Sequence, residues 1–220
     1  MSDDYSNSVS DEFEVTHGHF EEKHANLAWR VLDAWRDMGT STRRLIREDP
    51  AEGRLLFYVL MADIVVFLSW TLKTIVMPMP DIPVPAVTSL VLIGTLMMRT
   101  ALMYVLAAGC GFTLKLFGGK GSWRDTRAGV FWGALVAAPF SLLASLITVA
   151  LAIWGVSGGG EPWYVVPLYW GSLIPFVFFI SHGLAEAHQM KAPPIFMVMS
   201  ILATLAVFIG LAISPDLSAY

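Results

Sequence analysis

The stretch KLFGGKGSWRDTRAGVFWGAL, residues 115–135, places four cations in a short connector between two long apolar stretches. The cations are Lys115, Lys120, Arg124 and Arg127. Only 15% of the 220 residues are charged, so the grouping stands out in this chain. Lys and Arg are concentrated in the cytoplasmic loops of membrane proteins. The connector therefore predicts a cytoplasmic turn between two membrane-spanning helices.

The composition of the whole chain supports an integral membrane protein. Hydrophobic residues make up 55% of the sequence, and the mean hydropathy is +0.61. Soluble domains carry about 25% charged residues, well above the share found here. Cys110 is the single cysteine, so the chain has no intrachain disulfide and no cysteine-based zinc site.

Five apolar runs follow the first 54 residues, and each exceeds the roughly 20 residues that a helix needs to cross a bilayer. Breaks rich in Pro and Gly separate them. The sequence therefore predicts an all-α fold, a bundle of five transmembrane helices with the spans 55–77, 86–114, 128–154, 163–184 and 193–214.

The N-terminal region divides into two segments before the first span. Residues 1–25 are acidic and lack periodicity, which predicts a disordered cytoplasmic tail. Residues 26–54 are expected to form an amphipathic helix over 26–47 and a basic segment next to the membrane. The helix fits either an anionic membrane surface or the protein's own cytoplasmic face. Its apolar side is formed by Val31, Leu32, Trp35 and Met38.

The distribution of Lys and Arg predicts the topology. They gather in the N-terminal region and in the 115–127 connector, with Lys191 after the fourth run, whereas the other connectors and residues 215–220 have none. We therefore expect a cytoplasmic N-terminus and an exoplasmic C-terminal tail. Four cations in one connector of a membrane bundle do not form a groove that could bind nucleic acid, so nucleic acid is not an expected partner. The topology anchors are Arg43, Arg44, Arg47, Lys115, Lys120, Arg124 and Arg127.

Asp63 and Arg99 are the ionisable residues furthest from the ends of their spans. A charge at the bilayer centre costs at least about 2.5–3.5 kcal/mol, so each needs a partner. The first two spans are antiparallel neighbours, which makes an Asp63–Arg99 pair conceivable. The pair is either a structural ion pair or part of a path for protons or substrate.

Small residues recur at every fourth position of the third span, at Gly133, Ala137, Ser141 and Ser145. Such a stripe permits close approach of a second helix. The second helix belongs either to the same bundle or to a partner, including a second copy of the chain. Pro139 and Pro175 are expected to kink the third and fourth spans.

Other polar motifs give weaker signals. His182, Glu186 and His188 do not share one helix face, so no metal site is expected. The segment 118–121 departs from the phosphate-loop pattern, because Gly121 occupies the required Ser or Thr position. No catalytic motif such as GxSxG or HExxH is present. We therefore expect no enzyme activity, no catalytic residues and no cofactor.

The ordered pattern resembles the Yip1 family, in particular its bacterial branch of small five-span proteins. The resemblance rests on REDPAEGRLLFY before the first span, the connector KLFGGKGSWRDTRAG, and Pro139 in AAPFSLL. It implies a five-helix domain with a cytoplasmic N-terminus and an exoplasmic C-terminus. Eukaryotic relatives act in membrane trafficking with small GTPases. Their DLxGP-like element is replaced by ADIVVFLSW, which argues against a GTPase partner.

These observations predict a non-enzymatic protein of the bacterial inner (plasma) membrane. It is expected to organise or scaffold other membrane components, with the lipid bilayer and a membrane-protein partner or a second copy as its contacts. One alternative is a transporter or channel for small solutes or ions that uses Asp63 and Arg99. Another is an accessory subunit of a larger membrane complex.

Overall fold

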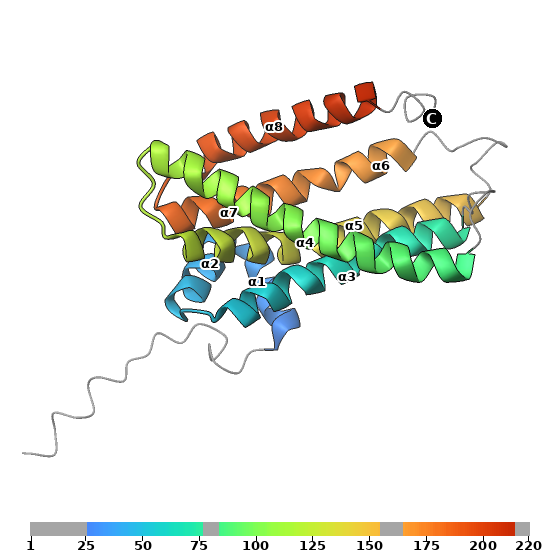
Figure 1. Cartoon of the computed structure of the whole chain (residues 1–220), viewed down its shortest axis with the longest axis horizontal. Coiled ribbons are helices and arrows are strands. Elements are labelled where there is room, and N and C mark those ends of the chain that lie inside the picture. Colours follow the sequence, from blue (N-terminus) through green and yellow to red (C-terminus); the bar gives the residue numbers. More distant parts are fainter. Residues whose placement is uncertain (1–25, 77–83, 155–164, 214–220) are drawn as a thin grey trace, which may run out of the picture.

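The computed structural model describes residues 26–76, 84–154 and 165–213, and within these ranges it contains eight α-helices and no strand. The expected tails over 1–25 and 215–220 lie outside the described residues. Figure 1 shows the longer helices running side by side along one axis. The helices are α1 Leu27–Arg36, α2 Met38–Arg47, α3 Glu52–Val76, α4 Val84–Leu116, α5 Trp123–Ile153, α6 Val165–Gly171, α7 Leu173–His188 and α8 Ala192–Ile213.

Four of the described helices are long and apolar enough to cross a membrane. They are α3, α4, α5 and α8, which correspond to the first, second, third and fifth expected spans. The fourth expected span, 163–184, is not one continuous helix, because α6 and α7 are separated at Ser172. Pro175 follows in the first turn of α7 and has no N–H to offer the carbonyl of Gly171. Proline thus weakens the helix where it is interrupted.

Helix α5 forms the centre of the bundle. All residues from 128 to 138 are buried, including Phe131 and Trp132, which are 0% exposed. A helix that is apolar all round is expected to be enclosed by others. In this fold α5 packs between α3 and α7, and Tyr58 of α3 lies with its ring centroid 5.2 Å from that of Trp132. The remaining helices are arranged around this three-helix core.

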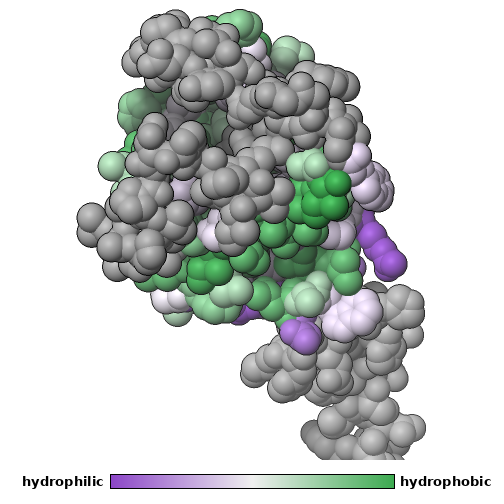
Figure 2. Space-filling view, turned by 90° about the vertical axis from the view of Figure 1, so that its right-hand side faces the viewer, coloured by the Kyte–Doolittle hydropathy of each residue, from purple (hydrophilic) through white to green (hydrophobic). Residues whose placement is uncertain are grey.

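The outer surface of the bundle is largely apolar. Figure 2 views the end at which α3 and α5 finish, and most described residues between the grey segments are hydrophobic. Large exposed apolar side chains occur between residues 97 and 116 of α4 and between residues 197 and 209 of α8, for example Val105 at 67% and Phe208 at 65%. In water such a continuous surface is rare, whereas lipid covers it without cost.

Glycines bring α5 and α7 into backbone contact. A Cβ atom on Gly129 would lie 2.6 Å from the carbonyl oxygen of Gly183, and a Cβ on Gly133 would lie 2.8 Å from the Cα of Ile180. Gly183 faces the carbonyl of Gly129 in the same way. Side chains larger than hydrogen would therefore force the two helices apart. Small residues at helix crossings in membranes allow this close approach.

The expected single helix over 26–47 is two helices. The chain breaks at Asp37, whose backbone is extended at φ −147° and ψ 91°. The Asp37 side chain accepts a hydrogen bond from the Thr40 N–H at 2.9 Å, which caps the start of α2. This hydrogen bond lowers the pKa of Asp37, so the capping carboxylate stays ionised. The break lets α1 and α2 fold back on each other.

The glycine contact predicts the effect of a single methyl group. We expect Gly129→Ala to reduce the free energy of unfolding by about 1–3 kcal/mol, the usual cost of overpacking. Gly109→Ala in α4 is the matched control, because a Cβ there meets nothing within 4 Å. Alanine favours a helix by about 1 kcal/mol over glycine, so the control should be neutral or more stable. Thermal unfolding in detergent, followed by circular dichroism, measures both. Equal melting temperatures would contradict the packing described here.

Candidate functional site

Charged residues gather at one end of the bundle, which we call the basic junction. It comprises α1 and α2, the start of α3, the end of α4, the connector 117–122, the start of α5 and the end of α7. The charged residues of α2 and of the start of α5 reach across to neighbouring elements there. Arg43 binds Glu186 of α7, with Nη2 and Oε2 3.0 Å apart, and Arg127 pairs with Glu52 at the start of α3. The ion pairs tie together segments far apart in sequence.

The α1–α2 hairpin is closed by its own ion pairs. Arg44 Nη1 lies 2.9 Å from Asp33 Oδ2, and Arg30 Nη2 lies 2.9 Å from Glu48 Oε1. The hairpin also reaches the core of the bundle, because the Trp132 indole donates a hydrogen bond to Ser41 Oγ at 3.1 Å. Met38, Ser41, Thr42 and Leu45 of α2 are buried. Helix α2 therefore packs on the protein itself.

The four predicted apolar residues of this segment divide between two environments. Met38 is buried and Val31 packs against the core, whereas Leu32 and Trp35 are each 41% exposed. The Trp35 indole donates a hydrogen bond to the carbonyl of Val136, 2.9 Å away. This carbonyl follows that of Leu135, which Pro139 leaves without its helical N–H donor. Trp35 thus binds α5 where proline interrupts the helix hydrogen bonding.

Arg124 holds the turn before α3. Its Nε donates to the Pro50 carbonyl at 2.9 Å and its Nη2 to the Asp49 carbonyl at 2.9 Å, while its Nη1 pairs with the Asp49 carboxylate at 2.5 Å. Asp49 has a positive φ of 49°, an uncommon conformation for a residue other than glycine. The planar guanidinium can satisfy several acceptors at once, which a lysine ammonium cannot do with the same geometry.

The remaining topology anchors are less enclosed. Lys115 Nζ lies 4.4 Å from the ring centroid of Trp123, a cation–π contact. Arg47 and Lys120 are exposed. All seven predicted anchors thus lie at the same end of the bundle, and four of them, Arg43, Arg44, Arg124 and Arg127, bind carboxylates of other segments.

The glycines of the connector serve the turn and its packing. Gly118 has φ 87°, and the N–H groups of Gly118 and Gly119 bond the carbonyls of Lys115 and Leu114, which ends α4 in a Schellman motif. Ser122 and Asp125 form a reciprocal capping box that starts α5. A Cβ on Gly119 would lie 2.6 Å from His188 Nδ1, so the connector lies directly on the end of α7.

His188 is enclosed beneath this connector and is 1% exposed. Its Nε2 lies 2.9 Å from Thr126 Oγ1, which donates its own hydrogen to the Ser122 carbonyl at 2.9 Å. Thr126 must therefore accept from His188, which places the imidazole proton on Nε2. The buried Nδ1 has no hydrogen-bond partner. Burial lowers the pKa of His188, the charge of Lys115 lowers it further, and Asp125 acts in the opposite direction.

Asp63 and Arg99 are in contact between α3 and α4. Arg99 Nε lies 2.6 Å from Asp63 Oδ1, and Thr100 Oγ1 donates to Asp63 Oδ2 at 2.8 Å. The Asp63 side chain is 1% exposed, and that of Arg99 is 23% exposed. Figure 1 shows α4 extending past the start of α3, and this overhang accommodates the different depths of the two residues in their spans. Each charge therefore has an opposite charge within the membrane region.

The small residues of α5 face other helices of the same chain. Gly133 contacts α7 at Ile180, and Ala137 is 3% exposed. Ser141 Oγ lies 3.4 Å from Ser69 Oγ of α3, and Ser145 is 8% exposed. The stripe is therefore occupied within the bundle.

The three polar residues near the end of α7 point to different neighbours. His182 packs against Phe178 with the two rings tilted and their centroids 4.1 Å apart, Glu186 binds Arg43, and His188 lies under the connector. Among the described residues, no three His, Cys, Asp or Glu side chains converge as metal ligands would.

Sequence reasoning missed two features of this region. The contact of Gly129 with Gly183 and the burial of His188 both depend on where α7 crosses α5. The spacing of Gly129 and Gly133 in GVFWG was a usable signal for a close helix crossing. Nothing local in the sequence marks His188 as buried.

A family model, the Yip1 domain, matches residues 33–214, which is well over half of the chain. The chain belongs to the Yip1 family. Yip1 proteins are in general non-enzymatic membrane proteins, and the apolar helices described above make this chain a multi-pass membrane protein. The match begins within α1, so the Yip1 domain includes α2 and most of the basic junction. No curated protein and no solved structure matches the chain.

Arg124 allows a test of geometry at constant charge. We expect Arg124→Lys to lower the free energy of unfolding by about 1 kcal/mol, because hydrogen bonds from a partly exposed charged group are lost. Cleavage by a protease within residues 48–51 should become faster in the same variant. Arg47→Lys is the control, since Arg47 is exposed and the net charge is again unchanged. Equal cleavage rates in both variants would rule out a structural role for the Arg124 fork.

His188 predicts a pH dependence of stability. The folded protein binds the proton more weakly than the unfolded chain, in which histidine has a pKa of about 6.5. The free energy of unfolding should therefore be highest above that pH and should fall as the pH drops from about 7 toward 5. His188→Gln should flatten this difference. Denaturation in detergent at several pH values measures it. If the wild type and His188→Gln showed the same dependence of unfolding free energy on pH, His188 would not be its source.

Proposed function

We propose that this Yip1 protein is a non-enzymatic scaffold of the bacterial inner (plasma) membrane that holds other membrane proteins through exposed helix faces. It crosses the bilayer five times, with α6 and α7 together forming the fourth span. The N-terminus and the basic junction lie in the cytoplasm, and the C-terminus lies outside. The gathering of Lys and Arg at one end of the bundle supports this orientation.

The observation that carries the proposal is the large uncovered surface of two spanning helices. Only 6% of the spanning residues of α8 and 17% of those of α4 are buried within the protein, against 33% of those of α5. Side chains along these helices, such as Leu102 at 58% and Leu205 at 51% exposed, offer packing surface to a helix of another protein. Van der Waals packing of this kind drives helix association in lipid.

The intramembrane pair supports a structural role for Asp63 and Arg99. Asp63 Oδ1 forms an ion pair with Arg99 and Oδ2 accepts a hydrogen bond from Thr100, so both oxygens contact groups of the protein itself. A carboxylate on a transport path must leave its protein partners to bind a solute or a proton. A carboxylate held by both Arg99 and Thr100 does so less readily. We therefore place the transporter second. An accessory subunit would differ from the scaffold in holding one fixed partner at constant ratio.

Photo-crosslinking in native membranes tests the proposal. A photoactivatable residue at Leu102 or Leu205 should capture the same discrete membrane proteins in independent preparations. The control position is Val136, which is 0% exposed and should give only intramolecular products. Lipid adducts alone from both exposed positions would overturn the scaffold.

Neutralising the pair separates the scaffold from the transporter. Asp63→Asn alone leaves Arg99 without its carboxylate, and breaking such a pair typically costs about 3–5 kcal/mol. The double variant Asp63→Asn with Arg99→Gln should recover much of that stability and retain the crosslinked partners. Solute and proton flux is then measured in reconstituted vesicles. If the wild type shows a flux that the folded double variant has lost, the result would favour the transporter.

A further inference from the structure

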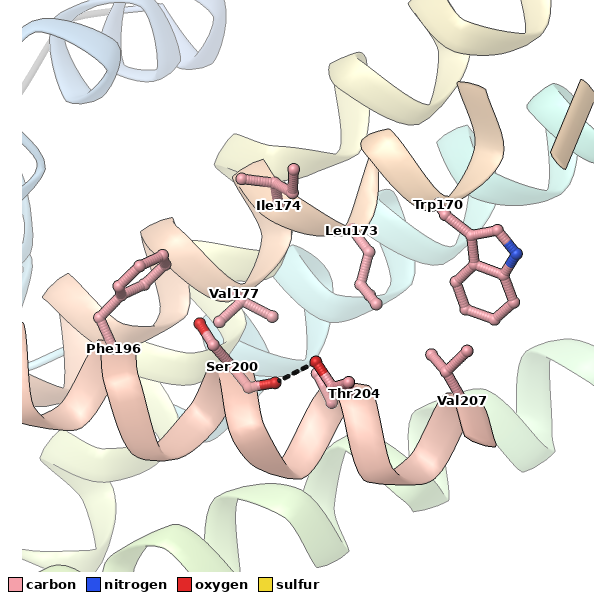
Figure 3. A pocket seen from close by; sticks show the side chains of 9 residues that line it. Trp170, Leu173, Ile174, Val177, Phe196, Ser200, Thr204 and Val207 are labelled. Atoms are coloured by element: carbon pink, nitrogen blue, oxygen red, sulfur yellow. Dashed lines mark hydrogen bonds between the residues drawn. The ribbon is translucent and has the colours of Figure 1, made fainter. Parts of the chain in front are cut away.

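A groove runs between α8 and the α6–α7 pair on the lipid-facing side of the bundle. It encloses a cavity of about 260 Å³. On α8 it is lined by Ser200, Ala203 and Thr204, and on the opposite side by Trp170, Ile174 and Val177. Figure 3 shows Trp170, Leu173 and Val177 directed toward Ser200 and Thr204 of α8, with Phe196 and Val207 toward the two ends of the groove. None of the lining residues is ionisable.

The groove exists because α8 departs from α7 along its length. Near the basic junction the helices are in contact, and Ile195 at the start of α8 is 6% exposed. Val177 of α7 is also 6% exposed, but Ile174, one turn further away, is 64% exposed. The facing residues of α8 are small at the middle of this stretch, so they do not fill the space. The lining therefore runs from Val177 along the α6–α7 pair to Trp170 of α6.

Water is a poor occupant of this groove. A water molecule needs two to four polar partners, and apolar cavities of proteins stay dry and bind apolar molecules. The Thr204 hydroxyl already donates to the Ser200 carbonyl at 2.8 Å (Figure 3). The surrounding solvent at this depth is hydrocarbon, because α8 is a spanning helix. The chemistry of the lining thus selects an apolar ligand.

The shape of the groove selects an extended chain. Phe196 and Val207 are eleven residues apart on α8, which corresponds to roughly 16 Å at 1.5 Å per residue. One leaflet contributes about half of the 30 Å hydrocarbon thickness, or about 15 Å. We propose that this groove binds one acyl chain of a membrane phospholipid, held between α8 and the α6–α7 pair. The site is separate from the helix faces proposed for partner proteins, and it stands whether or not a partner is found.

A phospholipid with a photoreactive diazirine in its acyl chain tests the site. The protein is reconstituted into nanodiscs that contain the probe, irradiated, and digested for mass spectrometry. We expect adducts to concentrate on the groove residues Ile174, Val177 and Ala203, well above those on Leu202 and Leu205 of the outer α8 face. Equal labelling of the two faces of α8 would overturn the proposal. So would labelling by a diazirine fatty acid without labelling by the phospholipid.

Two tryptophan variants at nearly the same depth provide matched controls. Ala203→Trp fills the groove, whereas Leu205→Trp adds the same ring to the opposite, 51% exposed side of α8. The first should lose the groove adducts and the second should keep them. Ala203→Leu is the milder variant if Ala203→Trp does not fold, and it should reduce the adducts. Unchanged groove labelling in a folded Ala203 variant would show that the chain lies elsewhere.

Discussion

The backbone contact between α5 and α7 sets the geometry of the rest of the protein. Gly129 and Gly183 face each other's carbonyls, and Gly133 lies against the backbone of Ile180. In lipid there is no hydrophobic driving force between helices, so close packing must supply the attraction. Because this crossing fixes the end of α7, it also fixes where Glu186 meets Arg43 and where His188 meets the connector. A wider crossing would loosen these contacts together.

Charge near and within the bilayer is arranged in pairs. Asp63 and Arg99 neutralise each other between α3 and α4, and Arg127 and Glu52 join α5 to α3 at the basic junction. Cations placed beside a membrane favour a cytoplasmic position. Here most of the same cations also hold one segment of the protein to another. The cations of the α4–α5 connector and the start of α5 therefore both orient the protein in the membrane and hold its segments together.

The hydropathy pattern was sufficient for most of the architecture, because a spanning helix must be about 20 apolar residues long. Helix α5 begins at Trp123 rather than at residue 128, since the capping box of Ser122 and Asp125 extends it through the charged connector. The sequence pattern did not predict the break at Asp37. A polar residue on the outer face of an amphipathic helix gives the same pattern whether it continues the helix or caps the next one.

The candidate site was less accessible from sequence, because its contacts join distant segments. The spacing of Gly133, Ala137, Ser141 and Ser145 indicated a packing face, but the helix that meets it is not encoded locally. Asp63 lies nine residues from Arg54 and Arg99 lies sixteen residues from Lys115, yet the two residues meet, since α4 extends past the start of α3 (Figure 1). His188 looked like an ordinary polar residue at a helix end. Its burial follows only from the glycines that let the connector lie against it.

The docking of α1 and α2 has a consequence for how the chain is made. Trp35 bonds a carbonyl 101 residues later, and Arg43 bonds a carboxylate 143 residues later. Ribosomes add about 5–20 residues per second, so Arg43 waits on the order of 10 s for Glu186 to be synthesised. During that interval the hairpin lacks the α7 part of the surface on which it docks. The N-terminal segment is therefore the first part of the domain to leave the ribosome and among the last to reach its final place.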